Sequence, residues 1–88
     1  MNVGQIVLVK SGRDKDSLMI VLSVEDRYVF LVDGCRRKLV RPKKKNIKHV
    51  RPTKIVVNLV PCCGRSLQDA DIRKALRSYE LKEVSHIV

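Results

Sequence analysis

Lysine and arginine side chains are crowded into one segment of this 88-residue chain, between Arg36 and Lys54. The segment holds ten of the 19 basic residues and none of the nine acidic ones, so the net charge of +10 arises there and the rest of the chain is neutral. Arginine can grip a phosphate through two hydrogen bonds, and lysine acts as a mobile point charge. Because crowded like charges repel one another unless a polyanion neutralises them, the segment predicts a nucleic-acid-binding surface rather than an ordinary solvated face.

The other residues that could do chemistry form no comparable pattern. Cys62 and Cys63 are adjacent rather than spaced as the Cys-x₂₋₄-Cys pairs of zinc sites, and Cys35, His49 and His86 are scattered along the chain. The sequence has no Walker-type glycine-rich loop and no spacing that suggests a nucleophile with its base. We therefore expect no catalytic residues, no metal and no cofactor, and we interpret the cysteines as reduced thiols.

The hydropathy pattern argues against a membrane protein. The longest uninterrupted apolar run, Leu18 to Leu22, is far shorter than the ~20 residues that span a bilayer. The first ten residues lack the continuous apolar segment of a signal peptide. We expect a cytoplasmic protein with no membrane partner; a monomer is the expectation, although the sequence leaves the oligomeric state open.

The basic segment must be carried by a small scaffold rich in β-structure. Valine, isoleucine and leucine dominate the apolar residues, and five short stretches predict strands: residues 5–10, 17–24, 28–32, 37–40 and 47–50. Asp33-Gly34 predicts a hairpin turn between the third and fourth of them. Residues 43–46 predict a single helical turn, from which Lys43, Lys44 and Lys45 would fan out, with Lys44 and Lys45 solvated. Five short strands with tight links predict a small closed barrel.

The C-terminal third predicts an extension of this barrel. Residues 54–60 are interpreted as an extra strand or an extended connector, and a helix is predicted over about 68–80. Ser66 with Asp69 suggests its capping box. Its apolar face, consisting of Ile72, Ala75, Leu76 and Tyr79, would pack on the barrel or dock on a partner protein. The predicted organisation is a barrel domain at 1–52 and an extension at 53–88.

Residues 4–30 resemble the KOW motif, a strand–turn–strand unit of ribosomal proteins and transcription elongation factors. The resemblance rests on Gly4, the apolar strand Ile6 to Val9, Ser11-Gly12, Asp14-Lys15 and the apolar strand that ends at Val24. The next stretch, with Asp33-Gly34, Arg37-Lys38-Leu39 and the run from Arg41 to Val50, is similar to small bacterial relatives of eukaryotic- and archaeal-type large-subunit ribosomal proteins.

Asp16 departs from this family pattern, which usually has glycine there. A left-handed backbone is then expected at Asp16, since aspartate is among the few residues that tolerate it. The negative charge of Asp16 makes this turn less favourable to a phosphate.

The resemblance implies an SH3-like five-stranded barrel, a KOW domain, that binds RNA. The expected protein is non-catalytic and ribosome-associated, with rRNA or another structured RNA as its partner and the large ribosomal subunit as a further candidate. Its three aromatic residues offer little stacking surface for single strands. The alternative is a transcription-elongation-type KOW module that makes protein–protein contacts with RNA polymerase. The expected RNA-binding residues are Arg13, Lys15, Arg36, Arg37, Lys38, Arg41, Lys43, Lys44, Lys45, Lys48 and Arg51.

Overall fold

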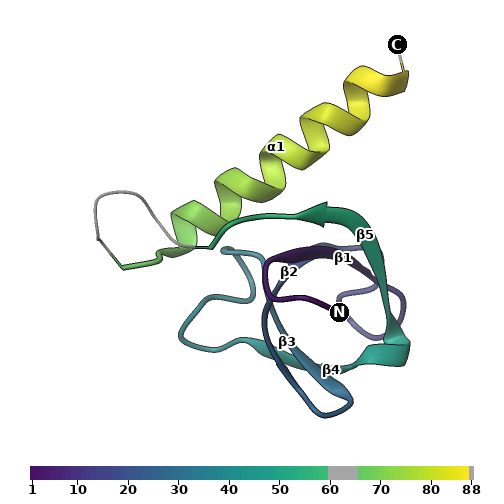
Figure 1. The fold of residues 1–88 in the computed structure, drawn as a ribbon, viewed down its shortest axis with the longest axis vertical. Helices are drawn as coiled ribbons and strands as arrows, with labels where there is room; N and C mark the ends of the chain where they lie inside the picture. Colours follow the sequence, from purple (N-terminus) through teal and green to yellow (C-terminus); the bar gives the residue numbers. More distant parts are fainter. Residues whose placement is uncertain (60–65, 88) are drawn as a thin grey trace.

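The computed structural model describes residues 1–59 and 66–87. In these ranges five antiparallel strands form one sheet, and a single helix follows them (Figure 1). The elements are β1 (Gln5–Val9), β2 (Leu18–Glu25), β3 (Tyr28–Val32), β4 (Lys43–Asn46), the 3₁₀ turn η1 (Ile47–His49), β5 (Val50–Val56) and α1 (Asp69–Ile87).

The strand order requires the sheet to curl. It is β4-β3-β2-β1-β5, so β4 and β5 lie at opposite edges although only η1 separates them in the chain. In a flat sheet, four spacings of about 4.8 Å would set these edges about 19 Å apart. The four residue steps from Asn46 to Val50 can span at most about 14 Å. The two edges are therefore drawn toward each other, as the curved strands in Figure 1 show. No hydrogen-bonded pairing joins β4 to β5 in the described part of the chain.

Two hydrophobic clusters form on the two faces of this sheet. The first lies inside the curl, where Ile47 of η1 packs against it; its buried members are Val7, Val9, Met19, Val21, Val29, Leu31 and Val50. The second lies between the sheet and α1, and its buried members are Ile6, Ile20, Val32, Ile72 and Leu76. Because β1 and β2 contribute to both clusters, both faces of these strands are covered, as expected for residues 5–10.

The predicted apolar face of the helix also packs as the sequence indicated. Ile72 and Leu76 are buried, and Ala75 and Tyr79 are half-buried against the second cluster. Reciprocal capping bonds form at Gln68, two residues after the predicted cap Ser66: the Gln68 N–H donates to Asp71 Oδ2 at 2.9 Å, and Gln68 O accepts from Asp71 N–H at 2.9 Å. The helix continues to Ile87, well past the predicted end, through residues that include no glycine or proline.

The first three predicted strands are confirmed, but the positions of the fourth and fifth were wrong. Residues 37–40 form no strand and lie in the β3–β4 loop, with a turn at Leu39 and Val40. In this loop Asp33 Oδ1 accepts hydrogen bonds from the N–H groups of Cys35 (2.9 Å) and Arg37 (2.8 Å). The predicted helical turn at 43–46 is instead β4, and the predicted strand at 47–50 is mostly η1. β5 runs across the expected domain boundary at residue 52 and includes the start of the predicted connector.

Gly34 is required by a close packing contact rather than by a tight hairpin. Its φ is +80°, and a Cβ atom there would lie 2.5 Å from Asp69 O and 2.7 Å from Arg73 Cγ. The expectation that Asp33-Gly34 directly links two strands was therefore wrong. The dipeptide begins the long β3–β4 loop at the point where that loop meets α1.

Candidate nucleic-acid interface

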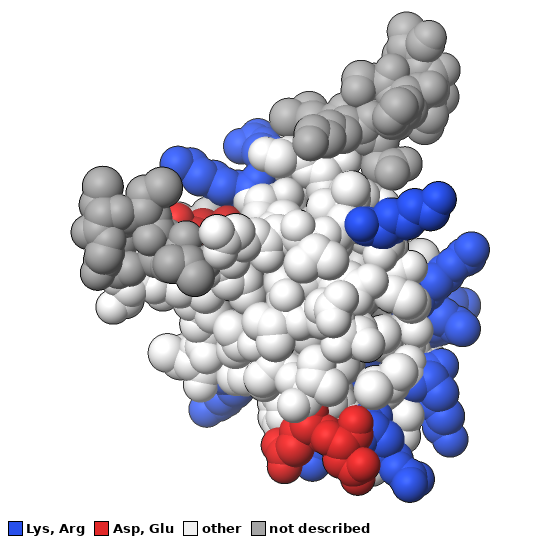
Figure 2. Space-filling model, viewed as in Figure 1, with Lys and Arg blue, Asp and Glu red and all other residues white. Residues whose placement is uncertain are grey.

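Three segments meet at one end of the curled sheet: the β1–β2 loop, η1 and the start of β5. The Lys10 N–H donates to His49 O at 2.8 Å, and Arg51 pairs with Leu8 near the end of β1. These adjoining segments carry five exposed cations, which we call the basic rim: Lys10, Arg13, Lys15, Lys48 and Arg51. Figure 2 shows Lys and Arg side chains along the right margin, where β5 descends to η1 in Figure 1, while the face toward the reader is mostly uncharged.

The β1–β2 loop is held by its own backbone hydrogen bonds. Asp16 N–H donates to Val9 O (2.8 Å), and Ser17 N–H donates to Asp14 O (3.0 Å). Asp16 has φ +70°, which confirms the left-handed backbone expected at this departure from the family pattern. The amides of Lys15, Asp16 and Ser17 all donate within the turn, and the side chains of Arg13 and Lys15 are exposed to a ligand.

The three consecutive lysines do not fan out, because they lie in β4 and alternate between the two faces of the sheet. Lys44 is exposed, and its Nζ lies 4.5 Å from the centroid of the Tyr28 ring. Lys43 and Lys45 are half-buried, and Lys45 Nζ donates to Ser11 O at 2.7 Å. The expectation that Lys45 is solvated was therefore wrong. Its ammonium group ties β4 to the β1–β2 loop.

Arg37 is likewise engaged within the protein. Asp14 is 2% exposed, and its Oδ2 accepts from Arg37 Nη2 at 3.0 Å. This ion pair joins the β1–β2 loop to the β3–β4 loop across 23 positions of sequence. No pattern in the sequence indicates that these two residues pair. Arg37 was therefore predicted to contact RNA from its charge alone.

A second group of cations lies where the β3–β4 loop meets α1. The Leu39 N–H donates to Asp69 Oδ1 at 2.8 Å, and Arg73 Nη1 donates to Gly34 O at 2.6 Å. The exposed members of this group are Arg36, Lys38, Arg41, Arg73 and Arg77. The helical members were not among the expected contacts, because an amphipathic helix normally carries charge on its solvent face and no sequence signal brings that face to the loop.

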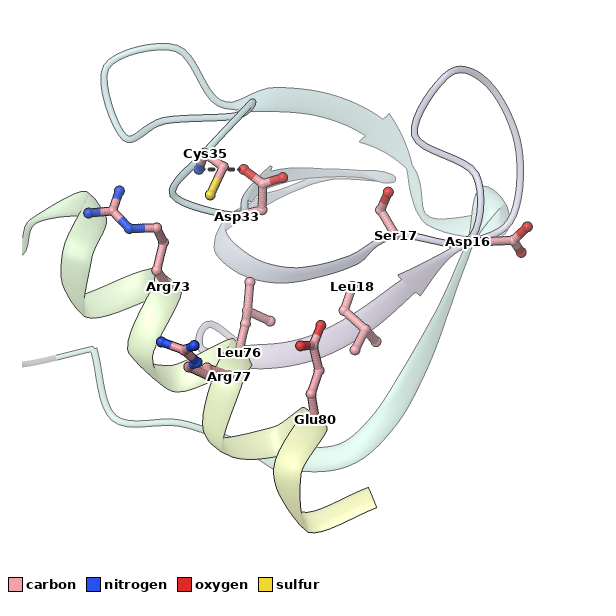
Figure 3. Close-up of a pocket in the computed structure, with 9 residues that line it drawn as sticks. All are labelled: Asp16, Ser17, Leu18, Asp33, Cys35, Arg73, Leu76, Arg77 and Glu80. Atoms are coloured by element: carbon pink, nitrogen blue, oxygen red, sulfur yellow. Dashed lines mark hydrogen bonds between the residues drawn. The ribbon is translucent and has the colours of Figure 1, made fainter. Parts of the chain in front are cut away.

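A hollow of about 510 Å³ lies between this group and the end of the β1–β2 loop. Figure 3 shows Arg73 and Arg77 on the side of α1 near the loop that carries Asp33 and Cys35. Asp16, Asp33 and Glu80 also line it, so its charge is mixed. Since carboxylates oppose phosphate binding, this hollow is a poorer anion site than the basic rim.

The cysteine, histidine and acidic residues were the other candidates for chemistry in the sequence. Among residues 1–59 and 66–80, whose side chains are described, no three His, Cys, Asp or Glu residues gather where they could hold a metal ion. No helix in these ranges is long and apolar enough to cross a membrane. Cys35 is exposed, His49 is exposed on η1, and Cys62 and Cys63 lie outside the described residues. No protein-family model matches the chain.

Proposed function

We propose that this protein is a non-catalytic RNA-binding protein that associates with the ribosome, and that the basic rim is its main contact with the RNA backbone. The observation that carries the proposal is the meeting of the β1–β2 loop, η1 and β5, fixed by the 2.8 Å bond from Lys10 to His49. Five exposed cations then lie at one end of the sheet, where a phosphate backbone can displace their counterions.

The arrangement of the strands supports an SH3-like KOW barrel as the scaffold. The sheet is antiparallel and five-stranded, its edges are drawn together by η1, and the KOW-like β1–β2 turn is retained with Asp16 in the expected backbone conformation. Structured RNA is the favoured target because Lys44 already lies over one face of Tyr28, the exposed aromatic residue of the sheet, which leaves little surface for stacking single-stranded bases.

A binding assay with a structured rRNA fragment tests the assignment. With about six phosphate contacts, affinity should fall about a thousandfold between 50 and 200 mM salt. The double variant Arg13→Glu/Lys48→Glu should bind at least about tenfold more weakly, and its salt slope should be smaller by about two. The unfolding midpoint should not change, because both side chains are exposed.

Lys74→Glu is the single-site control, since Lys74 is exposed on α1 and lies outside the rim. It should reduce affinity much less than either Arg13→Glu or Lys48→Glu alone. Equal losses for all three would show that net charge matters and the rim does not. Absence of salt-sensitive RNA binding would refute the proposal. Protein partners that survive nuclease treatment of a lysate pull-down would instead favour the polymerase-contacting module.

A further inference from the structure

A second hollow lies between the tip of the β3–β4 loop and the first turn of α1. Its volume is about 460 Å³, and it is open to solvent. Its apolar wall comes from Leu39, Val40, Leu67 and Ala70, and its two cations are Lys38 and Arg73. Asp69 also lines it, but Asp69 Oδ1 is occupied by the hydrogen bond from the Leu39 N–H.

Val40 is the unusual member of this wall. It is 91% exposed, more than any other large apolar residue in the described ranges, whereas its neighbour Leu39 packs into the cluster under α1. Val40 therefore adds almost nothing to the folded core. With the half-buried Leu39 and Leu67 and the exposed Ala70, it forms a contiguous apolar wall beside Lys38 and Arg73, and such a patch can serve as a contact surface.

The tip is held in place before any ligand arrives. Arg41 N–H donates to Lys38 O at 2.9 Å and closes a turn around Val40. The bonds from Leu39 to Asp69 and from Arg73 to Gly34 anchor this turn to α1. Because the loop is already ordered, a ligand at Val40 would not have to supply the free energy of ordering it.

We propose that this hollow receives one unstacked nucleotide of the bound RNA, with the base or ribose against Val40 and the adjoining phosphates near Lys38 and Arg73. This inference rests on the proposed function. The flanking cations and the lack of acids between Arg36 and Lys54 favour a polyanion over a protein segment. In a continuous duplex the faces of the bases are covered by stacking, so a bulge or loop is needed to present one.

Two hairpin RNAs test the inference, one fully paired and one identical except for a single bulged nucleotide. The wild-type protein should bind the bulged hairpin about tenfold more tightly. Val40→Ser should lower affinity for the bulged hairpin about fivefold, since it removes most of one apolar contact. Its affinity for the paired hairpin should stay the same. Val3→Ser is the control. Val3 is an exposed apolar residue just before β1, and this change should alter neither affinity.

Equal wild-type affinities for the two hairpins, or a Val40→Ser variant that affects both or neither, would overturn the nucleotide site while leaving the RNA-binding proposal intact. Failure to bind either hairpin at low salt would instead refute the proposed function. If Val40→Ser spares both RNA affinities but removes a nuclease-resistant protein partner, the hollow is a protein-docking site and the inference is wrong. An unchanged thermal melt of Val40→Ser is expected and checks that folding is intact.

Discussion

Neighbouring residues of the same type have different roles in this protein. Arg36 is exposed, whereas Arg37 places its guanidinium against the buried carboxylate of Asp14. Lys44 is exposed, whereas Lys45 bonds to Ser11 O. In both pairs the half-buried cation ties the β1–β2 loop to another segment, which is the β3–β4 loop for Arg37 and β4 for Lys45, while the exposed cation keeps its charge at the surface. Counting charges along the segment therefore overstates the number of phosphate contacts.

Arg37→Ala should destabilise the protein by about 3 kcal/mol, because it leaves the Asp14 carboxylate buried without its partner. Asp14→Ala should cost less, since Arg37 is partly exposed and its side chain can reach water. Urea denaturation of both variants measures the difference. Arg36→Ala is the matched control and should change the free energy of unfolding by less than about 0.5 kcal/mol. Similar costs for Arg36→Ala and Arg37→Ala would contradict the assigned role of the ion pair.

The β3–β4 loop and α1 act as one structural unit. The loop contains no regular strand, yet it is tied to the helix through Leu39 and Gly34 and to the β1–β2 loop through Arg37. The helix in turn covers the outer face of β2 through the second cluster. The position of the second cationic group therefore depends on how α1 packs.

Gly34→Ala tests this dependence, and Gly12→Ala is its control. Both glycines have positive φ, so alanine at either site incurs a backbone cost of about 1 kcal/mol. At Gly12 a Cβ atom meets only the end of the Lys45 side chain, where at most the bond to Ser11 O is disturbed, whereas at Gly34 it meets the backbone of α1. Gly34→Ala should therefore cost at least about 1 kcal/mol more in chemical denaturation. Equal costs would mean that the helix can move away without loss.

At the scale of the whole molecule, one sheet serves two cores. Residues of β2 alternate between the cluster inside the curl and the cluster under α1, so neither core forms without this strand. The sheet and the helix should then unfold together, although the sequence suggested a barrel domain followed by a separate extension.

Ile20→Asp should abolish the folded state, because it places an unpaired charge at a fully buried site between the sheet and α1. Circular dichroism should lose its strand and helix signals together. Ser23→Asp, at an exposed site on the same strand, should cost less than about 1 kcal/mol. A variant Ile20→Asp that kept a folded sheet and lost only the helix would show that the second core is dispensable.

Much of the scaffold follows from local pattern. The alternation of apolar residues predicted β1, β2 and β3, and the helical period of Ile72, Leu76 and Tyr79 predicted the face of α1 that packs on the sheet. These signals work because each depends on side chains close together in the chain. The excess of basic residues is likewise a property of composition alone.

Tertiary structure decided which of those basic residues are available. A run of lysines has low strand propensity, yet Lys43–Asn46 forms β4 because the edge of β3 offers hydrogen bonds to it. The curl of the sheet then brings Lys45 to Ser11, and loop packing brings Arg37 to Asp14. These contacts join residues far apart in the chain, and their free energy depends on distance and burial. Neither quantity is present in the order of the residues, so only the folded chain separates structural cations from exposed ones.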